Sequence, residues 1–75
     1  MARYYFDLLD GTIQRDQIGA ELINDAAAKQ EALMRALTGS ASHQIAHYNG
    51  SEEIAVRNEG GEQIFKTPIM RMASN

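Results

Sequence analysis

Three aspartates near the start of the chain are the first residues whose chemistry needs to be considered. Asp7, Asp10 and Asp16 lie in what reads as one hairpin, and carboxylates brought together across two strands can act as an acid–base pair or hold a divalent cation. Asp10 is followed by Gly11, which is a strong hairpin-turn signal, and no nucleophile with a plausible base stands near Asp7 or Asp16. We therefore expect Asp10 to make the turn and the other two to solvate the open side of a sheet.

Two histidines have the spacing of metal ligands. His43 and His47 are four residues apart, so a helix would place them on one side. A site needs a third ligand, and no HExxH pattern surrounds the pair. Ser40 and Ser42 lie near His43 but lack a third group that would orient a catalytic triad. We expect two surface histidines, no metal, no cofactor and no catalytic residue, and hence a protein that is not an enzyme.

The charge of the chain argues against a nucleic-acid partner. Seven Lys and Arg residues face ten Asp and Glu residues, so the formal net charge is −3. Such a domain repels a phosphate backbone unless its cations cluster, and no basic run is present. Binding of nucleic acid would require Arg3, Arg57, Lys66 and Arg71 to converge on one surface. We regard nucleic acid as an unfavoured partner.

The size and composition favour a domain reinforced by a partner. At 75 residues we expect one domain, residues 1–75, whose core contributes only about 3–5 kcal/mol of net stability. The chain has no cysteine, so no disulfide strengthens it, which fits a reducing compartment. Asp7 and Asp10 interrupt any signal-peptide pattern, and no segment has the ~20 apolar residues of a membrane span. We expect a cytoplasmic protein without membrane contact that self-associates.

The strand patterns predict two hairpins. Alternating and aromatic residues predict a first strand at 3–9 and a less regular second strand at 12–22, with a bend or bulge where Asp16 and Gly19 fall. A third strand is expected at 53–58, and a fourth from 63 to about 70. Glu59–Glu62 is the second hairpin turn. Pro68 lacks an N–H, which indicates a sheet edge or exit.

An alanine-rich segment between the hairpins predicts one helix. Asn24 or Asp25 caps it, and we expect it to run from about Asp25 to Tyr48, either continuously or with a bend or break near Gly39. Its large apolar residues recur at helical spacing and are assigned to the core. That stripe consists of Ala26, Leu33, Leu37, Ala41 and Tyr48, with Met34 and Ile45 at its edge and Gln30 and Gln44 nearby.

These elements predict an α+β fold of the order ββαββ, a small antiparallel sheet with one amphipathic helix packed on one face. The predicted core consists of Tyr4, Phe6, Leu8, Leu33, Leu37, Ile54 and Val56. A single helix leaves the other sheet face open. A possible interaction surface is expected there, made of Tyr5, Asp7, Leu9, Ala55 and Arg57.

Short motifs along nearly the whole chain form a characteristic combination. They are Arg3–Leu8, Asp10–Gly11, Asp16–Leu22, Glu31–Leu33, Glu53–Val56 and Glu62–Phe65. Together they resemble a family of short uncharacterised proteins, a domain of unknown function, that is common in soil alphaproteobacteria. The resemblance implies a bacterial setting, and it implies no activity and no binding residues.

Two functions remain open on this basis. The first is a small protein-interaction module, self-associating as a homodimer or bound to a protein partner through the open face or an edge strand. The second is a regulatory or nucleic-acid-associated domain, because some bacterial antitoxins also begin with an aromatic strand and pack a helix on a small sheet. That second reading is an analogy of fold, and fold does not determine function.

Overall fold

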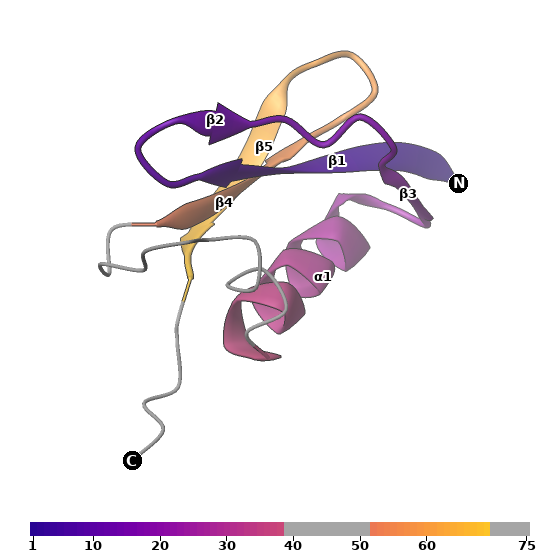
Figure 1. The fold of residues 1–75 in the computed structure, drawn as a ribbon. Coiled ribbons are helices and arrows are strands. Elements are labelled where there is room, and N and C mark those ends of the chain that lie inside the picture. The colour runs from indigo at the N-terminus through magenta and orange to yellow at the C-terminus, as the bar shows by residue number, and fades with distance from the viewer. Residues whose placement is uncertain (39–51, 70–75) are drawn as a thin grey trace.

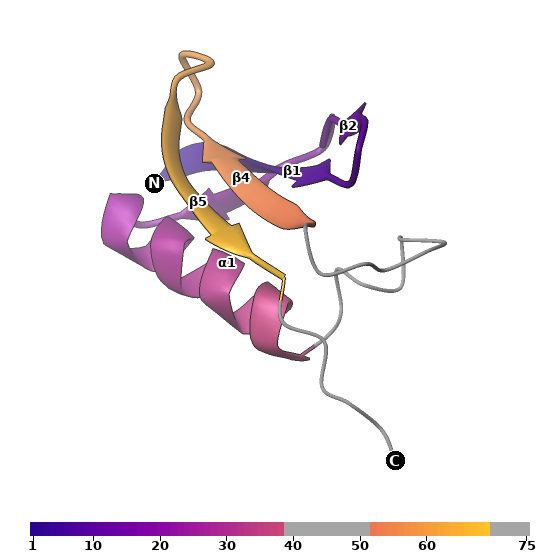
Figure 2. The same ribbon diagram turned by 90° about the vertical axis from the view of Figure 1, so that its left-hand side faces the viewer.

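The computed structural model describes residues 1–38 and 52–69 (Figure 1). The described strands and helix, in chain order, are β1 (Ala2–Leu9), β2 (Ile13–Gln14), β3 (Ala20–Leu22), α1 (Asp25–Thr38), β4 (Glu53–Arg57) and β5 (Gln63–Pro68). One helix packs on a small antiparallel sheet of five strands, and Figure 2 shows α1 lying along a single face of it. The predicted α+β fold is therefore confirmed.

The first strand is the centre of the sheet. One edge of β1 pairs with β4, in the register Tyr5↔Arg57 and Asp7↔Ala55. Its other edge is shared by two short strands, with β2 beside the end of β1 and β3 beside its start. The remaining strand, β5, pairs with β4 and with no other of the described strands. The long aromatic strand β1 thus fixes the register of β2, β3 and β4 directly.

The first hairpin turns where the Asp-Gly pair predicts. Leu9 pairs with Ile13, and Gly11 has a φ of 98°, a conformation that costs glycine little and other residues more. The carboxylate of Asp10 accepts hydrogen bonds from the Thr12 hydroxyl (3.2 Å) and the Gln14 amide (2.9 Å). Asp10 is therefore a turn residue, as expected.

The predicted second strand is divided in two by the segment 15–19. Gly19 has a φ of 74°, and a Cβ there would lie 2.8 Å from the carbonyl oxygen of Tyr4 and 3.0 Å from the Tyr5 ring. Only glycine allows this close approach without a shift of the neighbouring chain. A bend was expected at this point, but the strand continues on neither side for more than three residues because 15–19 leaves the ladder.

The last strand forms the free edge of the sheet, and Pro68 fits that position. The backbone N–H of Ile69 donates to the carbonyl of Glu52 at 2.9 Å. Since alternate residues of an antiparallel strand bond to its neighbour, Pro68 turns its nitrogen away from β4 and no ladder bond is lost. The prediction that Pro68 marks a sheet edge is confirmed.

The helix begins with a side-chain cap. The Asn24 carboxamide oxygen accepts from the backbone N–H of Ala27 at 2.9 Å, which satisfies one of the free donors of the first turn. Asp25 instead accepts a 2.6 Å hydrogen bond from the Tyr4 hydroxyl, tying the start of α1 to β1. The predicted continuation of the helix to Tyr48 and the break near Gly39 lie outside the described residues.

The buried side of the helix is not the predicted one. Ala28, Ala32 and Ala36 are at most 2% exposed, whereas Leu33 and Leu37 are 43% and 50% exposed. Small residues let a helix lie close to a sheet whose own side chains are large, as those of β1 are. The assignment of Leu33 and Leu37 to the core is therefore wrong. The five predicted core residues of the sheet are buried: Tyr4, Phe6, Leu8, Ile54 and Val56.

Candidate functional site

The predicted interaction surface lies on one sheet face, opposite α1. Tyr5, Asp7 and Leu9 alternate along β1 and therefore point the same way. Their cross-strand partners on β4 are Arg57, Ala55 and Glu53, in that order. The prediction that these residues share one face of the sheet is therefore confirmed. Ala55 is only 3% exposed and Asp7 only 4%, so the middle of this face is closed, whereas Tyr5, Leu9 and Arg57 are partly exposed. That a partner binds here stays a prediction.

An ion pair occupies the middle of this face. Arg57 donates to Asp7 through Nε (2.6 Å) and Nη2 (3.1 Å), and the Asp7 side chain is 5% exposed. The guanidinium carbon also lies 4.8 Å from the centre of the Tyr5 ring, a distance typical of a cation–π contact. The hydrogen bond to Asp7 raises the pKa of Arg57 above its usual value. Asp7 is therefore a buried, paired carboxylate rather than a solvating one.

A second carboxylate holds the segment 15–19 against the edge of β1. Asp16 accepts hydrogen bonds from the backbone N–H groups of Phe6 (3.2 Å), Ile18 (3.0 Å) and Gly19 (3.1 Å). Its own N–H donates to Asp7 at 3.0 Å, and its carbonyl accepts from Arg57. Burial raises the pKa of Asp16, but these three N–H groups and the nearby charge of Arg35 outweigh it, so the pKa is lowered. Asp16 fills the gap in the ladder between β2 and β3.

These contacts leave little room for acid–base chemistry. Asp7 is held in an ion pair by Arg57. Asp16 is held by backbone donors that help to lower its pKa, whereas a general acid or base needs a pKa near the working pH. Among residues 1–38 and 52–69, no group of three His, Cys, Asp or Glu residues is placed to hold a metal ion. The prediction that His43 and His47 are surface residues without a metal falls outside the described residues.

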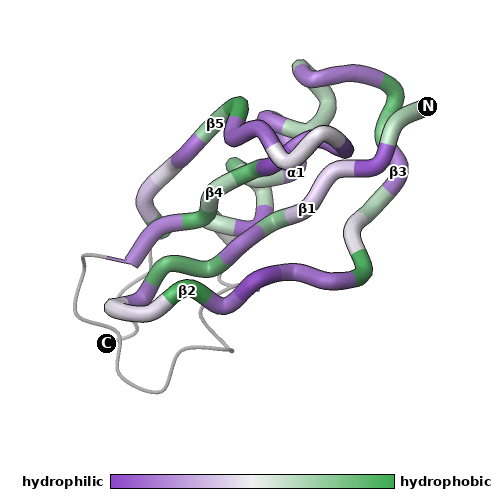
Figure 3. Tube along the Cα trace, turned by 90° about the horizontal axis from the view of Figure 1, so that it is seen from above, coloured by the Kyte–Doolittle hydropathy of each residue, from purple (hydrophilic) through white to green (hydrophobic). Residues whose placement is uncertain are grey.

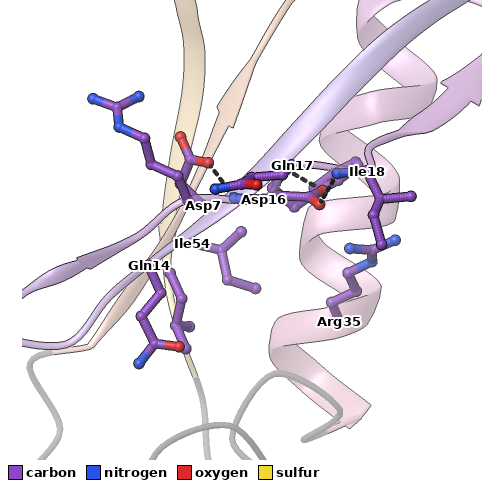
Figure 4. Close-up of a pocket in the computed structure, with 10 residues that line it drawn as sticks. Asp7, Gln14, Asp16, Gln17, Ile18, Arg35 and Ile54 are labelled. Atoms are coloured by element: carbon purple, nitrogen blue, oxygen red, sulfur yellow. Dashed lines mark hydrogen bonds between the residues drawn. The ribbon is translucent and has the colours of Figure 1, made fainter.

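A cleft of about 700 Å³ opens beside this network (Figure 4). The segment from Gln14 to Ile18 forms one wall, and Arg35 of α1 reaches toward it from the other side. The floor residues Phe6, Leu8 and Ile54 are at most 8% exposed. Arg35 lies 4.2 Å from the centre of the Phe6 ring and bonds to Glu31 at 2.9 Å. The cleft therefore has polar side chains around its opening and buried apolar side chains at its base.

Three of the exposed large apolar side chains among the described residues lie together on the outer side of α1. Leu33, Met34 and Leu37 are 43%, 52% and 50% exposed, and Ala26 and Gln30 are exposed on the same side of the helix. At 100° per residue these five side chains form one stripe, which we call the leucine face. The opposite stripe of Ala28, Ala32 and Ala36, the alanine face, packs on the sheet.

The charged side chains that border the leucine face are engaged within the same chain. Lys29 Nζ lies 6.0 Å from the centre of the Phe65 ring, at the outer limit of a cation–π contact. On the other side, Glu31 forms an i,i+4 ion pair with Arg35. The residues of the leucine face itself carry no charge, and the charged side chains at its borders are held in contacts within the chain.

Comparison with known proteins identifies the family. The model of a family described as a domain of unknown function, DUF6894, matches residues 3–71. The chain belongs to the DUF6894 family. No curated protein and no solved structure matches it. The predicted resemblance to a domain of unknown function is thereby confirmed, and the alphaproteobacterial setting stays a prediction.

Three of the four cations that nucleic-acid binding would require in this DUF6894 domain are paired with carboxylates. Arg3 pairs with Glu21 (3.1 Å) and Lys66 with Glu53 (3.6 Å), and Arg57 pairs with Asp7. Their register places all three on the sheet face opposite α1, where each cation meets a carboxylate. Arg71 lies outside the described residues. In the described part of the chain, the convergence that nucleic-acid binding requires is offset by these carboxylates.

Sequence reasoning found the leucine face of the DUF6894 domain but gave it the wrong partner. Its members were recognised as a stripe and assigned to the core because large apolar residues are usually buried. Ala28, Ala32 and Ala36 recur at intervals of four, and this second stripe was the available signal. The hydropathy of the chain seen from above (Figure 3) shows apolar residues along β1 and β4, which the alanine face covers.

No helix in the described ranges is long and apolar enough to cross a membrane.

Proposed function

We propose that this domain is a small protein-interaction module that docks a second protein chain through the leucine face of α1. The observation that carries the proposal is that α1 has two apolar faces and the sheet covers only one of them. Leu33, Met34 and Leu37 remain about half exposed, although a helix that needed only to cover the sheet would carry polar residues there.

The magnitude of the exposed surface suits a reversible contact. Complete burial of a leucine or methionine side chain stabilises by about 1.5–3 kcal/mol. A partner that covers the exposed half of these three side chains would therefore gain about 1 kcal/mol from each. Association costs at least about 4 kcal/mol, so neighbouring surface must contribute and the complex is expected to be weak.

The sheet edges are less suited to docking. The free edge of β5 carries Lys66 and Pro68, two residues that discourage the addition of another strand. The far edge of β1 is occupied by β2 and β3, and Asp16 binds the N–H of Phe6 between them. The leucine face supports an interaction better than either edge does.

The setting and character of the proposed role follow from the family and the composition. The family resemblance favours a bacterial protein, and the absence of cysteine fits the reducing cytoplasm. The role is binding rather than catalysis, because Asp7 and Asp16 are each held by protein donors. The small size and lack of a disulfide favour self-association as the form of the interaction.

A capture experiment with matched variants tests this role. Leu33→Asp together with Leu37→Asp should abolish retention of the native partner, or of a second copy, by the immobilised domain. Ile13→Asp is the control, because Ile13 is 60% exposed on β2. Equal retention by the wild type and the Leu33/Leu37 variant would contradict the proposal, as would loss of retention in the Ile13 variant alone.

A further inference from the structure

We propose that residues 15–19 form a latch, a segment that opens and closes as one unit at the edge of β1 and is held shut by charged side chains. The closed latch forms part of one wall of the cleft, next to Phe6 and Leu8. This role of the sheet edge is independent of the leucine face, which lies on α1.

The backbone of the latch is not part of the sheet ladder. Residues 15–19 lie between β2 and β3, and both of these short strands pair with β1. In the described part of the chain, no backbone–backbone hydrogen bond links residues 15–19 to β1. A strand within a sheet is fixed by a regular series of such bonds. The attachment of the latch therefore depends on side chains.

Three charged side chains from the sheet provide this attachment. Arg3 Nη1 donates to the carbonyl oxygen of Ile18 at 2.8 Å. Asp7 accepts from the backbone N–H of Asp16 at 3.0 Å, and Arg57 Nη2 donates to the Asp16 carbonyl at 3.1 Å. Because β4 lies on the other side of β1, Arg57 crosses the face of β1 to reach the latch. Hydrogen bonds from charged groups are stronger than neutral ones, so these contacts keep the latch closed.

The carboxylate of Asp16 gives the latch its shape. It accepts hydrogen bonds from the N–H groups of Ile18 (3.0 Å) and Gly19 (3.1 Å), both within the latch. It also accepts from the N–H of Phe6 on β1 at 3.2 Å. Figure 4 shows Asp16 between Asp7 and Ile18, with these contacts on either side of it. Because two of the bonds are internal, the latch moves as one unit.

Little apolar surface of the latch is buried against the sheet. Ile18 is 80% exposed, and Arg15 and Gln17 are exposed as well. Segments with few buried apolar contacts open locally at a lower free energy than the strands of a core. Opening of the latch therefore disturbs little packing, and it widens the cleft beside Phe6 and Leu8, which are at most 8% exposed when the latch is closed.

Amide hydrogen exchange, followed residue by residue by NMR, tests whether the latch opens by itself. The amides of Phe6, Ile18 and Gly19 report on the latch, and the amide of Ala55 reports on the sheet, because β4 is paired on both sides. We expect the three latch amides to share one opening equilibrium, at least about tenfold more populated than the opening that exposes Ala55. Equal protection of all four amides would overturn the proposal, as would three unrelated opening equilibria.

Two matched variants test whether a charged side chain holds the latch. Arg3 forms an ion pair with Glu21 at 3.1 Å in addition to its bond to Ile18. Arg3→Met removes both contacts and keeps an apolar side chain, whereas Glu21→Gln breaks the ion pair and leaves the bond to Ile18 in place. Arg3→Met should increase the open population of the latch about fivefold over that of Glu21→Gln.

The exchange of Ala55 is the internal reference for this pair of variants. It should change equally in Arg3→Met and Glu21→Gln, because both lose the same ion pair. The same exchange of the latch amides in the two variants would contradict a latch held by charged side chains. A larger change at Ala55 than at Ile18 in Arg3→Met would contradict it as well, since Arg3 would then stabilise the sheet rather than the latch.

Discussion

The two faces of α1 differ in what they do for the molecule, although both are apolar. The alanine face is at most 2% exposed and lies against the sheet, whereas the leucine face carries larger side chains that are about half exposed. Small side chains bring the helix close to the aromatic strand β1, and large ones extend away from it. Hydrophobicity alone therefore does not tell which side of a helix belongs to the core; the size of the residues on the opposing sheet decides it.

The largest difference between the two faces of α1 is expected when the same charge is placed on each of them. Ala32→Asp puts a carboxylate at a fully buried position of the alanine face, which should cost about 3 kcal/mol or more. Leu33→Asp, one residue along, should cost the isolated domain about 1 kcal/mol or less. Thermal unfolding followed by circular dichroism measures both. Equal destabilisation by the two variants would show that Leu33 belongs to the core.

A smaller change tests how the alanine face is held in place. Tyr4→Phe removes the hydroxyl that donates to Asp25 at 2.6 Å while leaving the buried ring. We expect a loss of about 1 kcal/mol, because Asp25 is exposed and regains water as a partner. Urea denaturation of the two chains measures the difference. An unchanged midpoint would mean that packing of the alanines alone fixes the start of α1.

The smallest expected effect is on the stability of the domain at low pH, and it depends on Asp16 at the sheet edge rather than on the helix. The pKa of Asp16 is lower when the chain is folded than when it is unfolded. Its contribution to stability is therefore present above the unfolded pKa, about 3.9, and is lost as the pH falls through the lower folded value. Asp16→Asn should make the free energy of unfolding depend less on pH below about pH 4. Near neutral pH it should change that free energy by an amount that does not vary with pH. An unaltered acid profile would contradict this role for Asp16.

Much of the fold could be predicted from local patterns. The Asp10-Gly11 turn, a cap at Asn24 or Asp25 and the edge position of Pro68 each depend on the chemistry of a few neighbouring residues. The structure bears them out, with Asn24 as the cap. The alternation along β1 also placed Tyr4 and Phe6 correctly in the core. These predictions succeed because backbone geometry and side-chain alternation are local properties.

The errors concern partners that are distant in the sequence. Asp7 looked like a solvated carboxylate because its partner Arg57 lies fifty residues further on. Segment 15–19 was expected to remain within a strand, but Asp16 attaches it to the edge of β1 through side-chain contacts. The choice between the two faces of α1 depends likewise on the size of residues in another element. Each of these outcomes is set by register and packing, which no local pattern contains.

The most direct test of the leucine face is a methyl NMR spectrum recorded from dilute to concentrated protein. The account predicts that the methyl signals of Leu33, Met34 and Leu37 shift with concentration and are broadened by a soluble paramagnetic probe only in dilute solution. The methyl signals of Ala28, Ala32 and Ala36 should stay unchanged and protected throughout. Leucine-face methyl signals that do not shift with concentration would contradict association of two copies through this face, whether or not they are protected from the probe.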